Sequence, residues 1–187
     1  MLTIPRELEL TPTTLDGVYR IRFARVRDER GSFVRTFDRA VFAARGLNAV
    51  WAEHGEAVNA RAGTLRGLHV QRAPHGEVKL IRCTRGAVYD VLVDVREHTP
   101  TFGRWEAFEL AEGDDAALYA PAGFAHGYQT LRDDTVMTYL HSAPYAAGAA
   151  TGYRYDSPAL AIRWPLAPTV MSARDRALAA FSSPPAR

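Results

Sequence analysis

The sequence has little cysteine and no long apolar run, and each shortage excludes a class of protein. Cys83 is the only cysteine among 187 residues, so a disulfide within the chain and a cysteine-cluster metal site are both excluded. No stretch reaches the 18 or so apolar residues that a membrane span needs. The opening MLTIPRELEL carries charges where a signal peptide would be apolar. These features predict a protein of the reducing cytoplasm that does not associate with a membrane.

Lysine is also scarce: Lys79 is the only lysine among the 23 Lys and Arg residues. A high-GC coding bias produces this preference without any function, although arginine also binds phosphate and carboxylate groups well. The formal net charge is only +2 and no long basic block occurs, which argues against nucleic acid as the main partner. The position of the single lysine is therefore more informative than the charge balance.

The chain length fits one domain, expected here over residues 1–187. Glycine and proline separate many short runs in which apolar and polar residues alternate, the pattern of β-strands. Such runs at regular spacing favour a sandwich or barrel over alternating βαβ units. Strands are expected over Val18–Val26, Thr64–Gln71, Val78–Thr84, Ala87–Val95, Trp105–Leu110, Ala117–Ala120, Gly127–Leu131 and Val136–Ser142.

Two short helices are expected beside the strands. Asp38 is a suitable N-cap for a helix that ends before Gly46. Ser172, with Asp175 three residues later, resembles a capping box that opens a last short helix through Ala177–Phe181. The loop-rich tail, about residues 143–187, is expected to pack over the barrel, with its last residues frayed.

Two basic side chains stand out in the strand-like runs: His69 in RGLHVQ and Lys79 in VKLIRC. Alternation places Gly67 and His69 on one face of the first run and Arg66 on the other. Arg66 reaches the same site as His69 only if Gly67 marks a bulge or the ligand crosses the strand's end. Lys79 lies between apolar neighbours, where burial is costly without a purpose. Alternatively, its stem is packed and its head lies in solvent at the barrel mouth.

Acidic and aromatic residues on other strands also need an explanation. In AVYDVLVDVR, Asp90 and Asp94 share one face of an apolar strand and therefore need partners. Asp94 is expected to pair with Arg96, whereas a histidine or arginine across the barrel suits Asp90. Tyr139 faces the barrel interior by alternation, where a tyrosine is usually a core residue.

Taken together, these segments occur in a recognisable order: DERGSF, RGLHVQ, GEVKLIRC, YDVLVDVR, TPTFGRW, PAGFAHGYQTL, a tyrosine six residues before Tyr145, and SxxD at Ser172–Asp175. The order and spacing closely resemble the dTDP-4-dehydrorhamnose 3,5-epimerase family of nucleotide-sugar enzymes, a branch of the cupin jelly rolls. The resemblance runs from about Asp28 to Asp175. It implies an all-β jelly-roll sandwich with a few short peripheral helices.

The resemblance also implies a reaction. The family's enzymes invert C3, C5 or both of a nucleotide-diphospho-4-keto-6-deoxyhexose in deoxysugar biosynthesis, without a metal or cofactor and as homodimers. By resemblance, His69 is the base, Lys79 stabilises the enolate, Tyr139 is the acid and Asp175 orients His69. Asp90 could share the orienting role, and Asp175 could instead serve only as a helix cap.

Further positions resemble those that hold the substrate. Arg30, Arg66 and Arg174 resemble contacts to the pyrophosphate and sugar, His126 a pocket histidine, and Tyr145 the ring that stacks on the base. His126 could instead be a turn residue and Tyr145 a surface aromatic. Arg35 stands where the family usually has a glutamate, and the AEHGEAVNARAG and AAGAATG segments also depart from its pattern. These departures leave the nucleotide and sugar open.

Two other functions fit parts of the sequence. A metal-dependent cupin oxygenase or isomerase would use His69, Glu77 and His126, but Gln71 stands in place of a further ligand histidine and is a poor ligand for transition metals. Bound stoichiometric metal in the purified protein would favour this alternative. A non-catalytic cupin that only binds sugar nucleotides is the second alternative, distinguished by the absence of solvent deuterium exchange into any such sugar.

Overall fold

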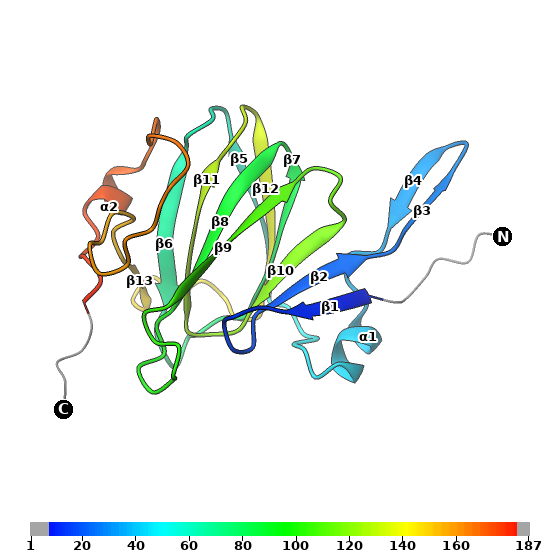
Figure 1. Ribbon diagram of the computed structural model, residues 1–187. Coiled ribbons are helices and arrows are strands. Elements are labelled where there is room, and N and C mark those ends of the chain that lie inside the picture. Colours follow the sequence, from blue (N-terminus) through cyan, green and yellow to red (C-terminus); the bar gives the residue numbers. More distant parts are fainter. Residues whose placement is uncertain (1–7, 183–187) are drawn as a thin grey trace.

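The computed structural model describes residues 8–182, which form two antiparallel sheets packed face to face (Figure 1). The six-stranded sheet has the order β1 (Leu8–Pro12), β2 (Tyr19–Phe23), β10 (Ala116–Ala120), β7 (Lys79–Arg85), β12 (Thr135–His141) and β5 (Glu53–Asn59). The five-stranded sheet has the order β13 (Ala150–Gly152), β6 (Leu65–Gln71), β11 (Phe124–Thr130), β8 (Ala87–Asp94) and β9 (Trp105–Ala111).

A hairpin and two short helices lie outside the sandwich. Strands β3 (Arg25–Asp28) and β4 (Gly31–Val34) form a separate hairpin that projects beyond the sheets (Figure 1). Helix α1 (Arg39–Ala44) lies on the side of the six-stranded sheet, and α2 (Ala173–Arg176) beside β6. The sequence prediction of an all-β sandwich with a few short peripheral helices is confirmed. Within residues 8–182, no helix has the length and apolar character needed to cross a membrane.

Three apolar clusters hold the layers together. The first lies between the sheets and includes Ile81, Leu92, Leu118 and Met137, all essentially inaccessible to solvent. A second cluster covers the outer face of the six-stranded sheet around Phe42 of α1. The third lies on the outer face of the five-stranded sheet, where the tail contributes Leu160 and Phe181. Apolar clusters therefore cover the inner faces and part of the outer face of each sheet, and the polar cavity described below lies in the layer between them.

Most expected strands are present, but several others escaped the sequence pattern. The predicted run Val18–Val26 divides at Ala24 into β2 and β3. Strands β1, β4, β5 and β13 were not predicted as strands. Strand β5 forms an edge of its sheet with a largely exposed sequence, EHGEAVN, so burial does not impose a strict apolar alternation on it.

The helix predictions are half right. The Asp38 side chain accepts hydrogen bonds from the backbone of Ala40 and Val41, which confirms the expected N-cap of α1. The last helix instead ends at Arg176, so the prediction of helix over Ala177–Phe181 is wrong. The backbone there bonds to the tail: Arg154 N–H donates to Ala179 O (2.9 Å) and Phe181 N–H to Ser157 Oγ (2.9 Å). Phe181 is thereby packed against the sheet. Residues 183–187, expected to be frayed, lie outside the described residues.

Asp94 ends β8 and holds the loop that follows, as expected from its pairing with Arg96. Arg96 donates from Nε to Oδ1 (2.9 Å) and from Nη2 to Oδ2 (2.6 Å), and the hydroxyls of Thr99 and Thr101 also donate to Oδ2. Burial by itself would raise the pKa of Asp94, but these donors outweigh it and the pKa lies below the usual value. The carboxylate therefore stabilises the fold above its unfolded-state pKa of about 3.9, and that contribution is lost as the pH falls through the lower folded-state value.

Asp94→Ala is expected to lower the free energy of unfolding by about 3 kcal/mol, because it removes the fully buried partner of Arg96 and two threonines. Urea denaturation at pH 7 measures this difference. The matched control is Asp156→Ala, which breaks an exposed pair with Arg154 and should change stability by less than about 1 kcal/mol. Equal effects of the two substitutions would contradict the role given to Asp94.

Candidate active site

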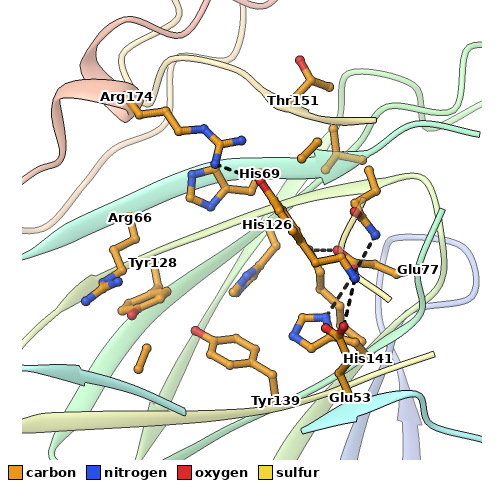
Figure 2. Close-up of a pocket in the computed structure, with 16 residues that line it drawn as sticks. Glu53, Arg66, His69, Glu77, His126, Tyr128, Tyr139, His141, Thr151 and Arg174 are labelled. Atoms are coloured by element: carbon orange, nitrogen blue, oxygen red, sulfur yellow. Dashed lines mark hydrogen bonds and ion pairs between the residues drawn. The ribbon is translucent and has the colours of Figure 1, made fainter. Parts of the chain in front are cut away.

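A cavity of about 290 Å³ opens between the two sheets (Figure 2). Strands from both sheets contribute to its walls, and the tail after β12 closes one side. Its polar and charged lining comes from Glu53, Arg66, His69, Gln71, Glu77, Lys79, His126, Tyr128, Tyr139, His141, Tyr145, Thr151 and Arg174. Seven of the nine site residues predicted from sequence line this cavity. Asp175 is an eighth, because it contacts the lining residue His69 although it does not line the cavity itself.

His69 of β6 is paired with Asp175 of α2. Nε2 of His69 lies 2.7 Å from Oδ1 of Asp175, while Oδ2 accepts from the backbone N–H of Gly67 (3.1 Å). Burial would raise the pKa of Asp175, but the contacts with His69, the backbone N–H of Gly67 and the side chain of Ser172 outweigh it. The pKa of Asp175 therefore lies below its usual value. Ser172 caps α2 by accepting from the Asp175 backbone N–H (3.0 Å). The alternative that Asp175 serves only as a cap is therefore wrong.

Arg66 reaches the same cavity because the backbone of β6 is irregular at Gly67. The pairing of β6 with β11 shifts register between His126 and Tyr128, opposite this glycine. Gly67 has a φ of 108°, and a Cβ there would lie 2.6 Å from the His126 carbonyl oxygen. Only glycine suits this conformation and this close approach. The bulge that would bring Arg66 to the His69 side is thus confirmed.

Lys79 begins β7 and is buried, with 8% of its side chain exposed, so the interpretation of a solvated head is wrong. Its Nζ lies 3.1 Å from Oε1 of Glu77, while Oε2 of Glu77 lies 3.2 Å from Nδ1 of His141. Burial would raise the pKa of Glu77, but His141 and Lys79 together hold that pKa below the usual value. An ionised carboxylate thus accompanies the only lysine.

A second histidine–carboxylate pair lies on the neighbouring strand β11, where His126 is the ladder partner of His69. Nε2 of His126 lies 2.8 Å from Oδ2 of Asp90, and both side chains are almost fully buried. Asp90 is therefore the partner of His126, and the alternative in which it orients His69 is wrong. His126 lies within β11 and lines the cavity, so the turn interpretation is also wrong.

Tyr139 of β12 lies beside these histidines. Its ring centroid is 5.9 Å from that of His126, and it stacks on His141 at 5.7 Å. Burial first, and then the neighbouring Tyr128 and Asp90, raise the pKa of Tyr139 well above its ordinary value. The hydroxyl therefore stays protonated at neutral pH.

The outer part of the cavity is formed by the tail. Tyr145 is 58% exposed, and Arg174 Nη1 donates to its hydroxyl at 3.5 Å. Figure 2 shows Arg174 beside His69, with Arg66 and Tyr128 at one end and Glu77, His141 and Glu53 at the other. The interior of the cavity therefore carries histidine, lysine and tyrosine side chains, whereas its outer rim carries arginine side chains.

Comparison with known proteins assigns the chain to a family. The family model described as dTDP-4-dehydrorhamnose 3,5-epimerase matches residues 12–183. The chain belongs to the dTDP-4-dehydrorhamnose 3,5-epimerase family. It is therefore an isomerase of the nucleotide-sugar epimerase class, and the resemblance recognised in its motifs is confirmed.

Individual relatives support the assignment over nearly the whole chain. The dTDP-4-dehydrorhamnose 3,5-epimerase of Sinorhizobium fredii is 41% identical over 170 residues, 90% of this chain and 87% of that protein. The crystal structure of the Bacillus anthracis enzyme with TDP and PPi bound has a TM-score of 0.91 and 32% identity, covering 94% of this chain and 100% of that one. A 3'-monoepimerase from Streptomyces bikiniensis in complex with dTDP-quinovose has a TM-score of 0.84 and 33% identity, covering 90% and 85%.

Two arginines that the family resemblance singled out lie away from the cavity of this chain. Arg30, at the tip of the β3–β4 hairpin, is 79% exposed and pairs with Asp28. Arg35, which stands in place of the family's usual glutamate, lies 2.9 Å from Asp38 at the start of α1. Neither lines the cavity described above.

Two lining residues, Tyr128 and Glu53, and their neighbour Asn59, which contacts Tyr128 and Arg66, were not predicted from the sequence. Tyr128 follows His126 by two positions on β11, so alternation alone could have placed it on the same face. Its hydroxyl donates to Asn59 Oδ1 (3.2 Å), which also accepts from Arg66 Nε (2.9 Å). Asn59 and Glu53 were missed because β5 was not predicted.

The residues of the metal-cupin alternative are engaged elsewhere. His69 pairs with Asp175, His126 with Asp90, and Glu77 with Lys79 and His141. Across residues 8–182, no three histidine, cysteine or acidic side chains converge as a metal-ligand group. The described residues therefore do not bring together the convergent donor group that this alternative requires.

Proposed function

We propose that this member of the epimerase family inverts C3, C5 or both of a dTDP-linked 4-keto-6-deoxyhexose. The observation that carries the proposal is the convergence of His69, Lys79 and Tyr139, from β6, β7 and β12, on one cavity. Each supplies a function that epimerisation next to a ketone requires: a base, a cation for the enolate and an acid.

His69 removes the proton from the carbon beside the ketone. With its Nε2 bonded to Asp175, the Nδ1 nitrogen is the one that accepts this proton. The buried carboxylate fixes the tautomer and stabilises the imidazolium that forms. Asp175 thus acts through His69.

Lys79 stabilises the enolate oxygen produced by this step. The negative charge develops on the former ketone oxygen, where a fixed ammonium in a buried site lowers the barrier. Tyr139 then returns a proton to the opposite face of the sugar. Its raised pKa suits an acid that is fully protonated before the reaction.

The cavity volume of about 290 Å³ lies at the lower end of the range for drug-sized ligands and suits the sugar alone. We place the keto sugar inside, near His126, and the pyrophosphate across the rim between Arg66 and Arg174. Bidentate guanidinium groups suit phosphate oxygens. The exposed Tyr145 ring then lies where a nucleobase can stack on it.

Tyr139→Phe is expected to separate proton removal from inversion. His69 and Lys79 remain, so deuterium exchange continues in part, whereas at least one epimerisation falls by about 10²-fold because its acid is missing. NMR of the product in D₂O measures both quantities. Full inversion at each exchanging carbon in this variant would show that Tyr139 is not the acid.

The proposed activity itself is tested with the wild-type protein and a panel of nucleotide-4-ketosugars in D₂O. Exchange followed by inversion at C3, C5 or both supports the proposal and identifies the substrate. A protein that binds these sugars without exchanging any C–H position would instead be the non-catalytic cupin.

A homodimer and a cytoplasmic location complete the proposal. The β3–β4 hairpin projects from the sandwich and carries the half-exposed Phe33 close to Arg30. Because Arg30 lies away from the cavity of its own chain, a role in substrate binding requires a second subunit. Analytical ultracentrifugation of the wild type and of Phe33→Ser tests the dimer.

A further inference from the structure

One carboxylate in the cavity is surplus to the base, cation and acid, yet it contacts the cation directly. Glu77 lies two residues before Lys79 and uses both carboxylate oxygens. Oε1 binds Lys79 Nζ at 3.1 Å, whereas Oε2 lies 3.2 Å from His141 Nδ1 and accepts from Gln71 Nε2 at 3.2 Å. The Glu77 side chain is 11% exposed.

The partners of Glu77 belong to the three strands that carry the reacting residues. Gln71 follows His69 by two positions on β6, and His141 follows Tyr139 by two positions on β12. Lys79 and His141 are direct partners in the ladder between β7 and β12. A single carboxylate therefore joins the strand of the base, the strand of the acid and the cation itself.

The Glu77 side chain is itself held firmly on the side away from Lys79. Gln71 donates also to the backbone oxygens of His75 and Pro144 (3.1 and 3.2 Å), and its Oε1 accepts from Ala146 N–H (2.6 Å). The Gln71 amide is thus fixed with its NH₂ group toward Glu77. Figure 2 shows Glu77 and His141 grouped at one end of the cavity.

An unpaired ammonium in a buried site favours loss of its proton. A neutral amine would neither attract an enolate oxygen nor hold a fixed position beside it. A charged neighbour at 3.1 Å opposes that loss, while the donors on Oε2 share the carboxylate's negative charge and keep it from cancelling the ammonium entirely.

We propose that Glu77, held by His141 and Gln71, is the positioning residue that keeps Lys79 protonated and directed into the cavity. This inference rests on the enolate-stabilising role proposed above for Lys79. Glu77 acts through the lysine and is not assigned a contact with the substrate.

The test uses the fact that Lys79 is the only lysine of the chain. Protein labelled with ¹³C at the lysine ε-carbon gives one ε-methylene signal, whose chemical shift follows protonation of Lys79 directly. In Glu77→Gln the midpoint of this titration is expected to fall by about 1 to 3 pH units, as on removal of an adjacent opposite charge. Glu77→Asp, which keeps the charge, should retain most of the wild-type midpoint.

Glu53→Gln is the matched control, because Glu53 is the other carboxylate that lines the cavity and its Oε1 accepts from Tyr145 N–H (3.1 Å). The other ionisable side chains that line the cavity with Lys79 are Arg66, His69, His126, Tyr128, Tyr139, His141, Tyr145 and Arg174. They are unchanged in both variants. A similar fall of the midpoint in Glu53→Gln and Glu77→Gln would assign the effect to general negative potential and overturn the proposal.

Activity provides the second readout. The alkaline limb of the deuterium-exchange rate should move to lower pH in Glu77→Gln, with a fall of about 10- to 100-fold in kcat at high pH and little change in KM, because only the transition state gains from the ammonium. An unchanged Lys79 midpoint or an unchanged pH profile would refute the role of Glu77. If the wild type exchanged no proton of any nucleotide-4-ketosugar, the proposed function would fail, while the NMR midpoint would still decide the Glu77–Lys79 link.

Discussion

His69→Ala is expected to abolish deuterium exchange at every carbon of the substrate, with a loss on the order of 10³–10⁴-fold, the upper part of the range for general acid–base catalysis. The other two histidines that line the cavity also pair with carboxylates, but both are less exposed than His69. His126 uses Nε2 to bind a fully buried carboxylate deeper in the wall, and His141 is tied to Glu77 beside the cation. Neither is expected to replace His69 as the base.

The variant should fold normally, because 41% of the His69 side chain is exposed and Asp175 keeps its hydrogen bond from Gly67. Binding of dTDP, measured by calorimetry, should change little. His98→Ala, in an exposed position after β8, is the matched control and should exchange at the wild-type rate. Near-full turnover by His69→Ala would show that the base has been assigned incorrectly.

Lys79→Met is the second change with a large expected effect, a loss of about 10²–10³-fold in the rate of exchange, as on removal of one oxyanion contact. Methionine replaces the unbranched apolar stem of the lysine but lacks the ammonium group that would stabilise the enolate. Because the ammonium acts on charge that appears only in the transition state, kcat should fall while KM changes little.

Lys79→Arg separates charge from shape. The guanidinium retains the positive charge next to Glu77 but is planar and wider, so we expect activity between those of Lys79→Met and the wild type. Stopped-flow measurement of exchange at several pH values compares the three proteins. If Lys79→Met exchanged as fast as the wild type, the ammonium would have no part in stabilising the enolate.

The sequence alone was sufficient to place on their strands the side chains that we propose to react. Alternation put His69, Lys79 and Tyr139 on single faces of short strands, and burial between two covered sheets made that pattern reliable. It failed at the edge strand β5, where exposure relaxes the pattern, so Glu53 and Asn59 were missed. Helix caps were also readable, because Asp38 and Ser172 act on backbone groups two or three residues away.

The pairing of charged groups could not be read in the same way. A period of two specifies a face of a strand but not which residue lies across the barrel, and so both Asp90 and Asp175 were open as partners for His69. The structure assigns Asp175 to His69, 106 residues away, and Asp90 to His126. Alternation alone placed Arg66 on the face opposite His69. In the structure, the irregular backbone at Gly67 brings Arg66 to the same side as His69.

Lys79, the only lysine, illustrates the difference between what the sequence determines and what only the tertiary structure decides. The sequence by itself determined the family, the two-sheet fold and the position of one lysine in a chain otherwise supplied with arginine. Only the tertiary structure decided that Lys79 is buried beside Glu77 and His141, with Glu77 bonded in turn to Gln71 at the end of β6. That arrangement depends on which strands are neighbours in the sheets, because alternation along one strand specifies its faces but not its partner strand.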